Sequence, residues 1–315
     1  MAVFTEISLD EAARLFERLK LGELRTLVGI ASGIENTNYF ADATQGQYVV
    51  TLFERLRRSE LPYYLELTQH LARRGLPVPR PHADAQGELV HTLSGKPAAV
   101  TDRLPGAPQF EPQPSHCATL GTTLARLHIA AGDYAREQPN PCGLAFWEQN
   151  VPWLLPLLPD PTLALLQSEL QFQRELAASA EYAALPRGAI HGDLFRDNVL
   201  FRAEQLSGLL DFYFAGSDTF VFDIAVCLND WCSDTDGRLS PDRADALMSA
   251  YASVRALNAQ EIQLTPALLR AAALRFWITR LCDLHRPRHA SLLQPHDPAQ
   301  FERILRQRLA EPWRP

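Results

Sequence analysis

The sequence predicts an α+β fold with two lobes: a first lobe with an antiparallel β-sheet and helix, and a second lobe that is mainly helical. Short β-type segments punctuated by glycines dominate residues 24–104, whereas helical spacing dominates the rest of the chain. Prolines and a glycine in residues 104–108 mark the change between the two regions. With 315 residues and 46% hydrophobic content, the chain has enough apolar material for two cores. We therefore expect one lobe over residues 1–103 and another over residues 104–315.

The first lobe is expected to begin with a short amphipathic helix. Ser8 followed by Glu11 is a capping-box pattern, and Gly22 ends the apolar run that follows it. A second helix is expected to have Pro62 in its first turn and to end at Gly75. The expected strands of this lobe are residues 24–30, 38–41, 47–53, 88–93 and 98–104.

The second lobe shows helical patterns near residues 115–131, 162–184, 241–257 and 266–285. Thr265 is the expected N-cap of the last of these helices, with Pro266 at its first helical position. Six prolines between residues 139 and 161 predict a loop-rich insertion.

Composition excludes several classes of function. A net charge of −7 disfavours nucleic acid as a partner, because such binding depends on clustered Lys and Arg. The five cysteines are odd in number and form no C-x-x-C pair, which indicates reduced thiols rather than disulfides or a zinc site. No apolar run approaches the ~20 residues needed to span a bilayer, so we expect a cytoplasmic protein without membrane contact. The oligomeric state stays open.

The central chemical pattern is His191-Gly192-Asp193, followed by Asn198 and, thirteen residues later, by Asp211. Phosphoryl transfer requires a carboxylate that orients the attacking hydroxyl, and oxygen ligands that hold Mg²⁺ against the nucleotide phosphates. Asp193 is therefore the expected catalytic residue, and Asn198 and Asp211 are the expected metal ligands. The alternative is that these side chains only cap loops and turns. His191 is expected to shape the loop rather than to transfer protons.

This stretch resembles the His-Gly-Asp-x-x-x-x-Asn loop of the aminoglycoside phosphotransferase and choline kinase superfamily. The resemblance implies a protein-kinase-like bilobal fold that uses ATP and Mg²⁺. It assigns nucleotide binding to the first lobe, and catalysis and substrate binding to the second. It also implies that Asp223, in Phe222-Asp223-Ile224-Ala225, braces the catalytic loop.

Residues 29–39 combine two glycines with small polar residues between two expected strands. Such a segment suits a flap whose backbone amides approach phosphates, although a hairpin with incidental polar residues would look similar. P-loop and dinucleotide-binding glycine patterns are absent from the sequence. The candidate nucleotide-binding residues are Ser32, Gly33, Asn36, Thr37 and Asn38.

One departure concerns the third strand, where kinases of this fold usually carry a lysine for the phosphates. Thr51 occupies the expected position, and a neutral hydroxyl cannot replace the charge. Arg55 or another base could compensate, with Glu66 as a candidate partner.

Over nearly its whole length the chain is similar to the homoserine kinases of this superfamily. The similarity is carried by residues 4–6, 33–39, 51–54, 211–216 and 222–225. It implies phosphorylation of the hydroxyl of L-homoserine in threonine biosynthesis, with L-homoserine and ATP as the small-molecule partners.

A zwitterionic amino acid needs a cation for its carboxylate and an acid or carbonyl for its ammonium group. Arg280 and Trp277 lie on an otherwise apolar helical stripe, and Asp230 follows an apolar run, so these three are the substrate-binding candidates. Arg280 could instead form a structural salt bridge with Asp283, and Asp230 could instead cap the next turn.

Two other functions remain open. A kinase for another hydroxylated amine, such as an aminoglycoside, choline or a sugar amine, would share the fold and the chemistry. Thr51 would also suit a non-catalytic pseudokinase that binds nucleotide.

Overall fold

The computed structural model describes residues 5–30, 36–286 and 296–315. The chain divides into two compact units, the first ending at Pro105 and the second beginning at Gly106. The assignment of nucleotide binding to one unit and catalysis to the other stays a prediction.

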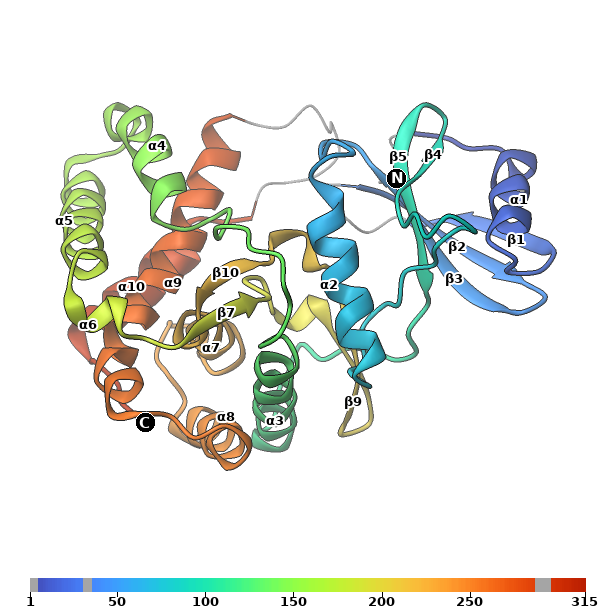
Figure 1. Cartoon of the computed structure of the whole chain (residues 1–315). Coiled ribbons are helices and arrows are strands. Elements are labelled where there is room, and N and C mark those ends of the chain that lie inside the picture. Colours follow the sequence, from blue (N-terminus) through green and yellow to red (C-terminus); the bar gives the residue numbers. More distant parts are fainter. Residues whose placement is uncertain (1–4, 31–35, 287–295) are drawn as a thin grey trace. The chain divides into compact units, whose positions relative to one another are not determined.

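The first unit contains a five-stranded sheet in which every neighbouring pair is antiparallel, in the order β1-β2-β3-β5-β4 (Figure 1). The antiparallel sheet expected for this region is therefore confirmed. Its strands are β1 (Leu24–Gly29), β2 (Asn36–Ala43), β3 (Gly46–Phe53), β4 (His91–Leu93) and β5 (Lys96–Asp102).

Two helices accompany this sheet, α1 (Leu9–Arg18) and α2 (Leu61–Arg73). The hydroxyl of Ser8 accepts a hydrogen bond from the backbone N–H of Glu11 (3.2 Å), which confirms the predicted cap. The apolar face of α1 packs against residues of the sheet, with the Phe16 ring 5.5 Å from that of Tyr48 in an edge-on contact. Burial of this face holds the helix on the sheet.

The second unit is mainly helical, as expected, and contains two small antiparallel sheets, β10-β7 and β6-β8-β9. Its helices are α3 (Pro114–Ala130), α4 (Leu144–Leu154), α5 (Asp160–Ala177), α6 (Ala180–Ala183), α7 (Phe220–Trp231), α8 (Pro241–Val254), α9 (Ala259–His285) and α10 (Ala299–Ala310). Its strands are β6 (Ala107–Pro108), β7 (Arg187–Ile190), β8 (Val199–Arg202), β9 (Gln205–Leu209) and β10 (Gly216–Thr219).

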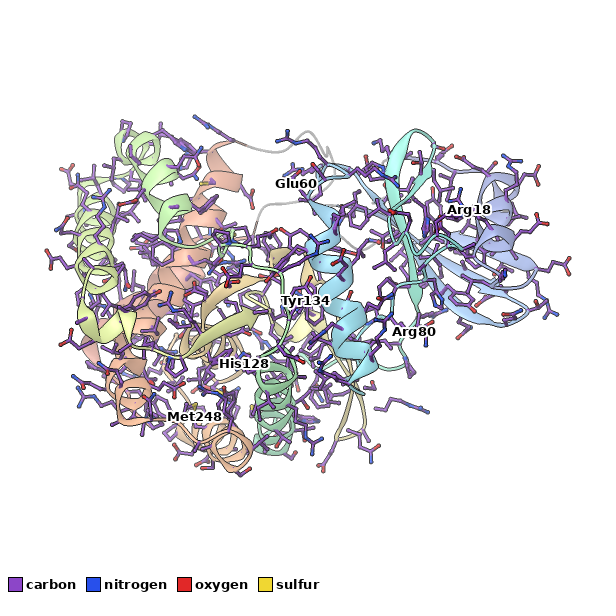
Figure 2. All side chains as sticks on the ribbon, viewed as in Figure 1. Arg18, Glu60, Arg80, His128, Tyr134 and Met248 are labelled. Atoms are coloured by element: carbon purple, nitrogen blue, oxygen red, sulfur yellow. The ribbon has the colours of Figure 1, made fainter. Side chains whose placement is uncertain are left out.

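The core of this unit is formed around α7, all of whose residues are buried, and the middle of α9. A helix that is buried on all sides must lie inside the domain. Beside them, α3 approaches α8 so closely that a Cβ on Gly121 would lie 2.2 Å from the backbone oxygen of Leu247. Figure 2 labels His128 and Met248 on these two helices.

Two expected features of the second unit are wrong. Helix α9 begins at Ala259 rather than at Pro266, because Asn258 and Glu261 form a complete capping box. Thr265 lies inside the helix, and its hydroxyl donates to the carbonyl of Glu261 (2.7 Å). The predicted loop over residues 139–161 contains α4 and a short 3-10 helix, Leu155–Leu157, because Pro152 is tolerated inside the helix and Pro156 lies in the 3-10 turn.

Within the described ranges, no helix is long and apolar enough to cross a membrane. All five cysteines carry thiols.

Candidate active site

The loop that the sequence predicts to be catalytic, called the catalytic loop below, runs from His191 to Asn198 between β7 and β8, and Asp211 lies in the turn that follows β9. Pairing of β8 with β9 places Val199 opposite Leu209, and the N–H of Leu210 donates to the carbonyl of Asn198 (2.8 Å). The two polar loops, although separate in sequence, are thereby tied together at one end of this hairpin.

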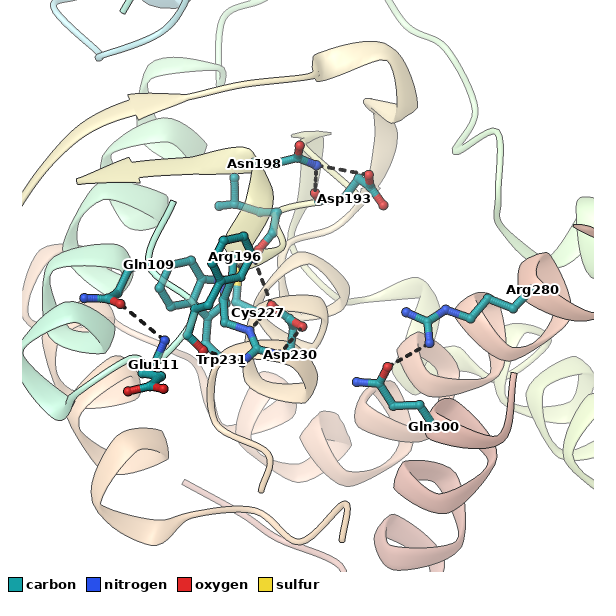
Figure 3. Close-up of polar contacts among 12 residues, drawn as sticks. Gln109, Glu111, Asp193, Arg196, Asn198, Cys227, Asp230, Trp231, Arg280 and Gln300 are labelled. Carbon is teal, nitrogen blue, oxygen red and sulfur yellow. Dashed lines mark hydrogen bonds and ion pairs between the residues drawn. The ribbon is translucent and has the colours of Figure 1, made fainter. Parts of the chain in front are cut away.

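Asp193 and Asn198 are in direct contact (Figure 3). The amide nitrogen Nδ2 of Asn198 donates to the backbone carbonyl of Asp193 (2.8 Å) and lies 3.2 Å from its carboxylate oxygen Oδ2. Because the amide nitrogen is turned to Asp193, the carbonyl oxygen of the Asn198 side chain points away from that carboxylate.

Asp211 comes one residue after Leu210, in the left-handed backbone region with φ 58° and ψ 66°. Asp and Asn adopt this region more readily than most other residues. The short 3-10 helix Phe212–Phe214 follows, and its end lies against the catalytic loop, because a Cβ on Gly192 would be 2.9 Å from the oxygen of Phe214. Gly192 has φ +74°, so a larger residue here would be strained and would clash.

His191 shapes the loop, as expected. Its ring is fully buried; Nδ1 accepts from the N–H of Asp193 (3.3 Å) and Nε2 faces the carbonyl of Leu210 (2.8 Å). Burial lowers the pKa of His191, which favours the neutral ring with its proton on Nε2. The imidazole thus links the Asp193 loop to the Asp211 loop.

Asp223 braces the same loop, which confirms its expected role. Its two carboxylate oxygens accept from the N–H groups of His191 and Gly192, both at 2.8 Å, and Oδ2 also lies 3.1 Å from Nε2 of His128. Burial alone would raise the pKa of Asp223, but the hydrogen bonds from His128 and from the backbone N–H of His191 help to lower it below its usual value. The brace therefore stays ionised.

Asp230 is engaged by Arg196 of the catalytic loop. Its Oδ2 accepts from the backbone N–H (2.9 Å) and from Nε (3.1 Å) of Arg196, while Oδ1 accepts from another guanidinium nitrogen of the same residue (3.2 Å). Asp230 therefore holds the turn at Arg196 in place, 34 residues earlier in the chain, rather than the turn that directly follows Asp230 (Figure 3).

The other two substrate candidates differ in exposure. Trp277 is completely buried and is a core residue in this structure. Arg280 donates to Oε1 of Gln300 (2.8 Å; Figure 3) and to the backbone oxygen of Asp297 (3.0 Å), both of them neutral acceptors. Burial lowers the pKa of Arg280 to about 10, while Asp230 is among the carboxylates that oppose the decrease. Arg280 thus remains cationic at neutral pH and lies within electrostatic reach of Asp230.

Of the nucleotide-binding candidates, Ser32 and Gly33 lie outside the described residues. Asn36, Thr37 and Asn38 lie in β2. Thr37 is buried and its hydroxyl donates to Glu54 (2.7 Å), and the side-chain oxygen of Asn38 accepts from the hydroxyl of Thr51 (2.7 Å). The side chains of Thr37 and Asn38 are thus engaged within this unit, so any phosphate contact from these two residues would come through the backbone.

Lys96 is a cation of the first unit that the sequence pattern did not single out. Its ammonium forms an ion pair with Glu54, and Lys96 is about one-third exposed while Glu54 is largely buried. The register Leu52↔Ala98 between β3 and β5, continued by two residues, places Glu54 opposite Lys96. No local sequence signal predicts that register, because the two residues are separated by a helix and a further strand.

Arg275 is the second residue that sequence reasoning missed. One of its terminal nitrogens donates to Oδ1 of Asp193 (3.0 Å) from the middle of α9. The available signal was an arginine within the apolar run of residues 271–278.

The chain is similar to known proteins over most of its length. The profile described as the phosphotransferase enzyme family matches residues 26–257. The chain is 58% identical to the homoserine kinase of Polaromonas naphthalenivorans strain CJ2, with 99% of each chain covered. It is 50% identical to the homoserine kinase of Cupriavidus metallidurans, with 99% of this chain and 100% of the relative covered.

Solved structures share the fold. An amicoumacin kinase in complex with AMP-PNP and Ca²⁺ aligns with a TM-score of 0.69 at 17% identity, covering 96% of this chain and 94% of the other. A choline kinase from Cryptosporidium parvum aligns with a TM-score of 0.63 at 12% identity, covering 96% of both chains. The expected protein-kinase-like α+β fold is thereby confirmed.

Proposed function

Because the chain belongs to the phosphotransferase enzyme family, we propose that it transfers the γ-phosphoryl group of ATP to the hydroxyl of L-homoserine. The products are O-phospho-L-homoserine, an intermediate of threonine biosynthesis, and ADP. Support for the acceptor comes from full-length relatives, at 50 to 58% identity, that are homoserine kinases. The observation that carries the chemistry is the contact of Asp193 with Asn198, in a loop tied to that of Asp211.

Asp193 is the residue placed to orient the acceptor hydroxyl and to take its proton. Its side chain is 16% exposed, so an incoming hydroxyl can reach a carboxylate that is otherwise fixed by hydrogen bonds. Such proton transfer and positioning typically contribute a factor of about 10² to 10⁴ to the rate.

Asn198 and Asp211 are the proposed ligands of Mg²⁺. Magnesium is usually held by one or two protein oxygen groups together with the substrate phosphates and water. No cluster of three or more His, Cys, Asp or Glu side chains able to hold a metal is found among the residues that the structure describes. The metal ion would supply charge neutralisation for the phosphates.

Phosphate contacts in the first unit are assigned to Lys96 and to the backbone of the flap. Thr51 carries no charge, and its hydroxyl donates to the side chain of Asn38. Lys96 instead supplies the ammonium group that kinases of this fold usually carry on the third strand. Glu54 holds the lysine in the role that a glutamate commonly has in kinases. Ser32, Gly33, Asn36, Thr37 and Asn38 would contribute backbone amides.

Arg280 and Asp230 are proposed to bind the two charges of the amino acid. Arg280 donates to two neutral acceptors, and neither of them offsets its positive charge. Its guanidinium therefore suits the carboxylate of the amino acid. A carboxylate offers about four lone-pair sites, so Asp230 can accept an ammonium group in addition to Arg196.

The alternative acceptors are other hydroxylated amines, because kinases named for other acceptors share this fold. A pseudokinase is disfavoured because the Asp193 loop is fully assembled: the brace, the histidine link and the Asn198 contact are all present. These contacts are needed for chemistry more than for nucleotide binding.

The catalytic role is tested by Asp193→Asn, which keeps the shape of the side chain but removes its charge. Turnover of L-homoserine should fall by ~10²-fold to 10⁴-fold while ATP binding is retained. Asp211→Asn should weaken binding of the magnesium nucleotide instead. Asp242→Asn, an exposed change of the same kind on α8, serves as the control and should leave both parameters unchanged. Near-normal turnover by Asp193→Asn would remove Asp193 from its role.

A further inference from the structure

Arg275 is a buried cation that touches the proposed catalytic carboxylate. The residue is 2% exposed, and its guanidinium lies 3.0 Å from Oδ1 of Asp193. The guanidinium also stacks over the ring of the neighbouring Phe276, at 3.6 Å from the ring centroid. An arginine stays charged in proteins, so this site buries a full positive charge. Asp193 supplies the compensating negative charge.

The two oxygens of Asp193 are held by different residues. Arg275 binds Oδ1, and Nδ2 of Asn198 lies 3.2 Å from Oδ2. A carboxylate that is fixed at both ends cannot rotate about its terminal bond without breaking a charge-assisted hydrogen bond. Its remaining lone pairs therefore keep one direction, as an oriented proton acceptor requires.

Aromatic rings fix the guanidinium itself. The Phe276 ring that carries it packs against Phe195 of the catalytic loop (4.2 Å between centroids) and against Phe301 of α10 (5.0 Å). Phe214, three residues after Asp211, lies 5.2 Å from the guanidinium. Arg275 thus contacts both polar loops of the site from a helix that is itself rigidly packed.

The hydrogen bonds of Arg275 differ from those of a structural arginine in the same unit. Arg308 is equally buried, and its three guanidinium nitrogens donate to Asn229, Gly237 and Ser233. By contrast, Nε of Arg275 is buried and has no acceptor among the described residues. A buried donor without a partner costs stability, and such groups concentrate where function requires them. Arg275 is therefore placed to bind Asp193 even though its own Nε is left without an acceptor among the described residues.

We propose that Arg275 is a positioning residue for phosphoryl transfer: it holds Oδ1 of Asp193 so that the carboxylate stays aimed at the acceptor hydroxyl. This rests on the proposed role of Asp193. Because only 3% of the Arg275 side chain is exposed, it acts through Asp193 and does not bind the amino acid. Loss of Arg275 should therefore lower kcat and leave KM for L-homoserine nearly unchanged.

The test compares Arg275→Met, which removes the charge at similar length, with Arg275→Lys, which keeps the charge without the planar fork. We expect kcat to fall by ~10-fold to 10²-fold in Arg275→Met, with partial recovery in Arg275→Lys and with both KM values within about threefold of wild type. In the Asp193→Asn background, Arg275→Met should change the residual turnover by less than about twofold, since residues that act as a unit are not additive.

Arg308→Met is the matched control, because it removes an equally buried arginine that makes no contact with Asp193. It should lower the melting temperature but leave kcat per folded enzyme unchanged. Circular dichroism gives the folded fraction of every variant, and Arg275→Lys covers the case in which Arg275→Met does not fold.

Three outcomes would overturn the inference: unchanged kcat in both Arg275 variants, a raised KM for L-homoserine at constant kcat, or an undiminished loss in the Asp193→Asn background. If wild-type enzyme produces no ADP with L-homoserine, the proposed substrate fails instead. The Arg275 and Asp193 single and double variants are then compared with the acceptor that does support turnover. A failure of the proposed substrate is thereby distinguished from a failure of the proposed role of Arg275.

Discussion

At the scale of single residues, three polar side chains in and beside the loop from His191 to Asn198 have tasks set by their hydrogen-bond partners. His191 is neutral and links two loops, Asp223 of α7 is ionised and braces the backbone, and Asp193 is held by Arg275 and Asn198 with 16% of its side chain exposed. The motif spacing was sufficient to predict that Asp193 and Asn198 lie close together, because both belong to one short loop. It could not identify Arg275 or Lys96, whose partners are far away in sequence and are set by helix packing and strand register.

The Lys96 assignment makes a prediction about nucleotide binding. A charge-assisted hydrogen bond is worth about 1.5 to 3 kcal/mol, so Lys96→Met should raise KM for ATP by ~10-fold to 10²-fold with a smaller effect on KM for L-homoserine. The chain's other lysine, Lys20, is exposed, and Lys20→Met provides the matched control. An unchanged KM for ATP in Lys96→Met would show that Lys96 does not contact the phosphates, and that another residue neutralises their charge.

At the scale of elements, strands and helices could be predicted where the signal is local, and less well where tertiary contacts decide. The Ser8 cap follows from adjacent residues, and so does the alternation of strands in the first unit. The start of α9 was misplaced because Pro266 is a strong signal for a first turn, yet the capping box at Asn258 lies about two turns earlier and determines the boundary. Prolines likewise led to a loop prediction for a segment that forms α4.

Three elements of the second unit, the loop after β7, α3 and α7, meet at Asp223, and this junction predicts acid lability. Burial lowers the pKa of His128 and of His191, so both are neutral when folded. Below the ordinary histidine pKa of about 6.5, these two histidines bind protons in the unfolded chain but not in the folded chain. The free energy of unfolding therefore decreases on acidification, by at most about 1.4 kcal/mol per pH unit for each histidine. The lowered pKa of Asp223 acts in the same direction at still lower pH.

Urea unfolding at about pH 7.5 and at about pH 5.5 measures this effect. The free energy of unfolding should be smaller at the lower pH. His285→Gln, which removes an exposed histidine at the end of α9, is the control and should show the same pH dependence as wild type. A free energy of unfolding that stays constant or rises on acidification would contradict the assignment of two buried neutral histidines.

At the scale of the whole molecule, the proposed division of labour places the nucleotide contacts in the unit that ends at Pro105 and the phosphotransfer residues in the unit that begins at Gly106. The fold class was predictable because the change from strand to helix patterns is abrupt. The acceptor was not predictable from local physics: one cation and one acid suit many zwitterions, and only similarity to full-length relatives selects L-homoserine.

ADP formation from ATP and Mg²⁺ with L-homoserine, compared with L-serine, choline and an aminoglycoside, tests this function most directly. L-homoserine should have the highest kcat/KM, with L-serine lower by ~10-fold to 200-fold because it lacks one methylene group, and Asp193→Asn should suppress the signal. Turnover of choline or the aminoglycoside without turnover of L-homoserine would contradict the substrate, and no magnesium-dependent turnover with any acceptor would contradict the enzyme.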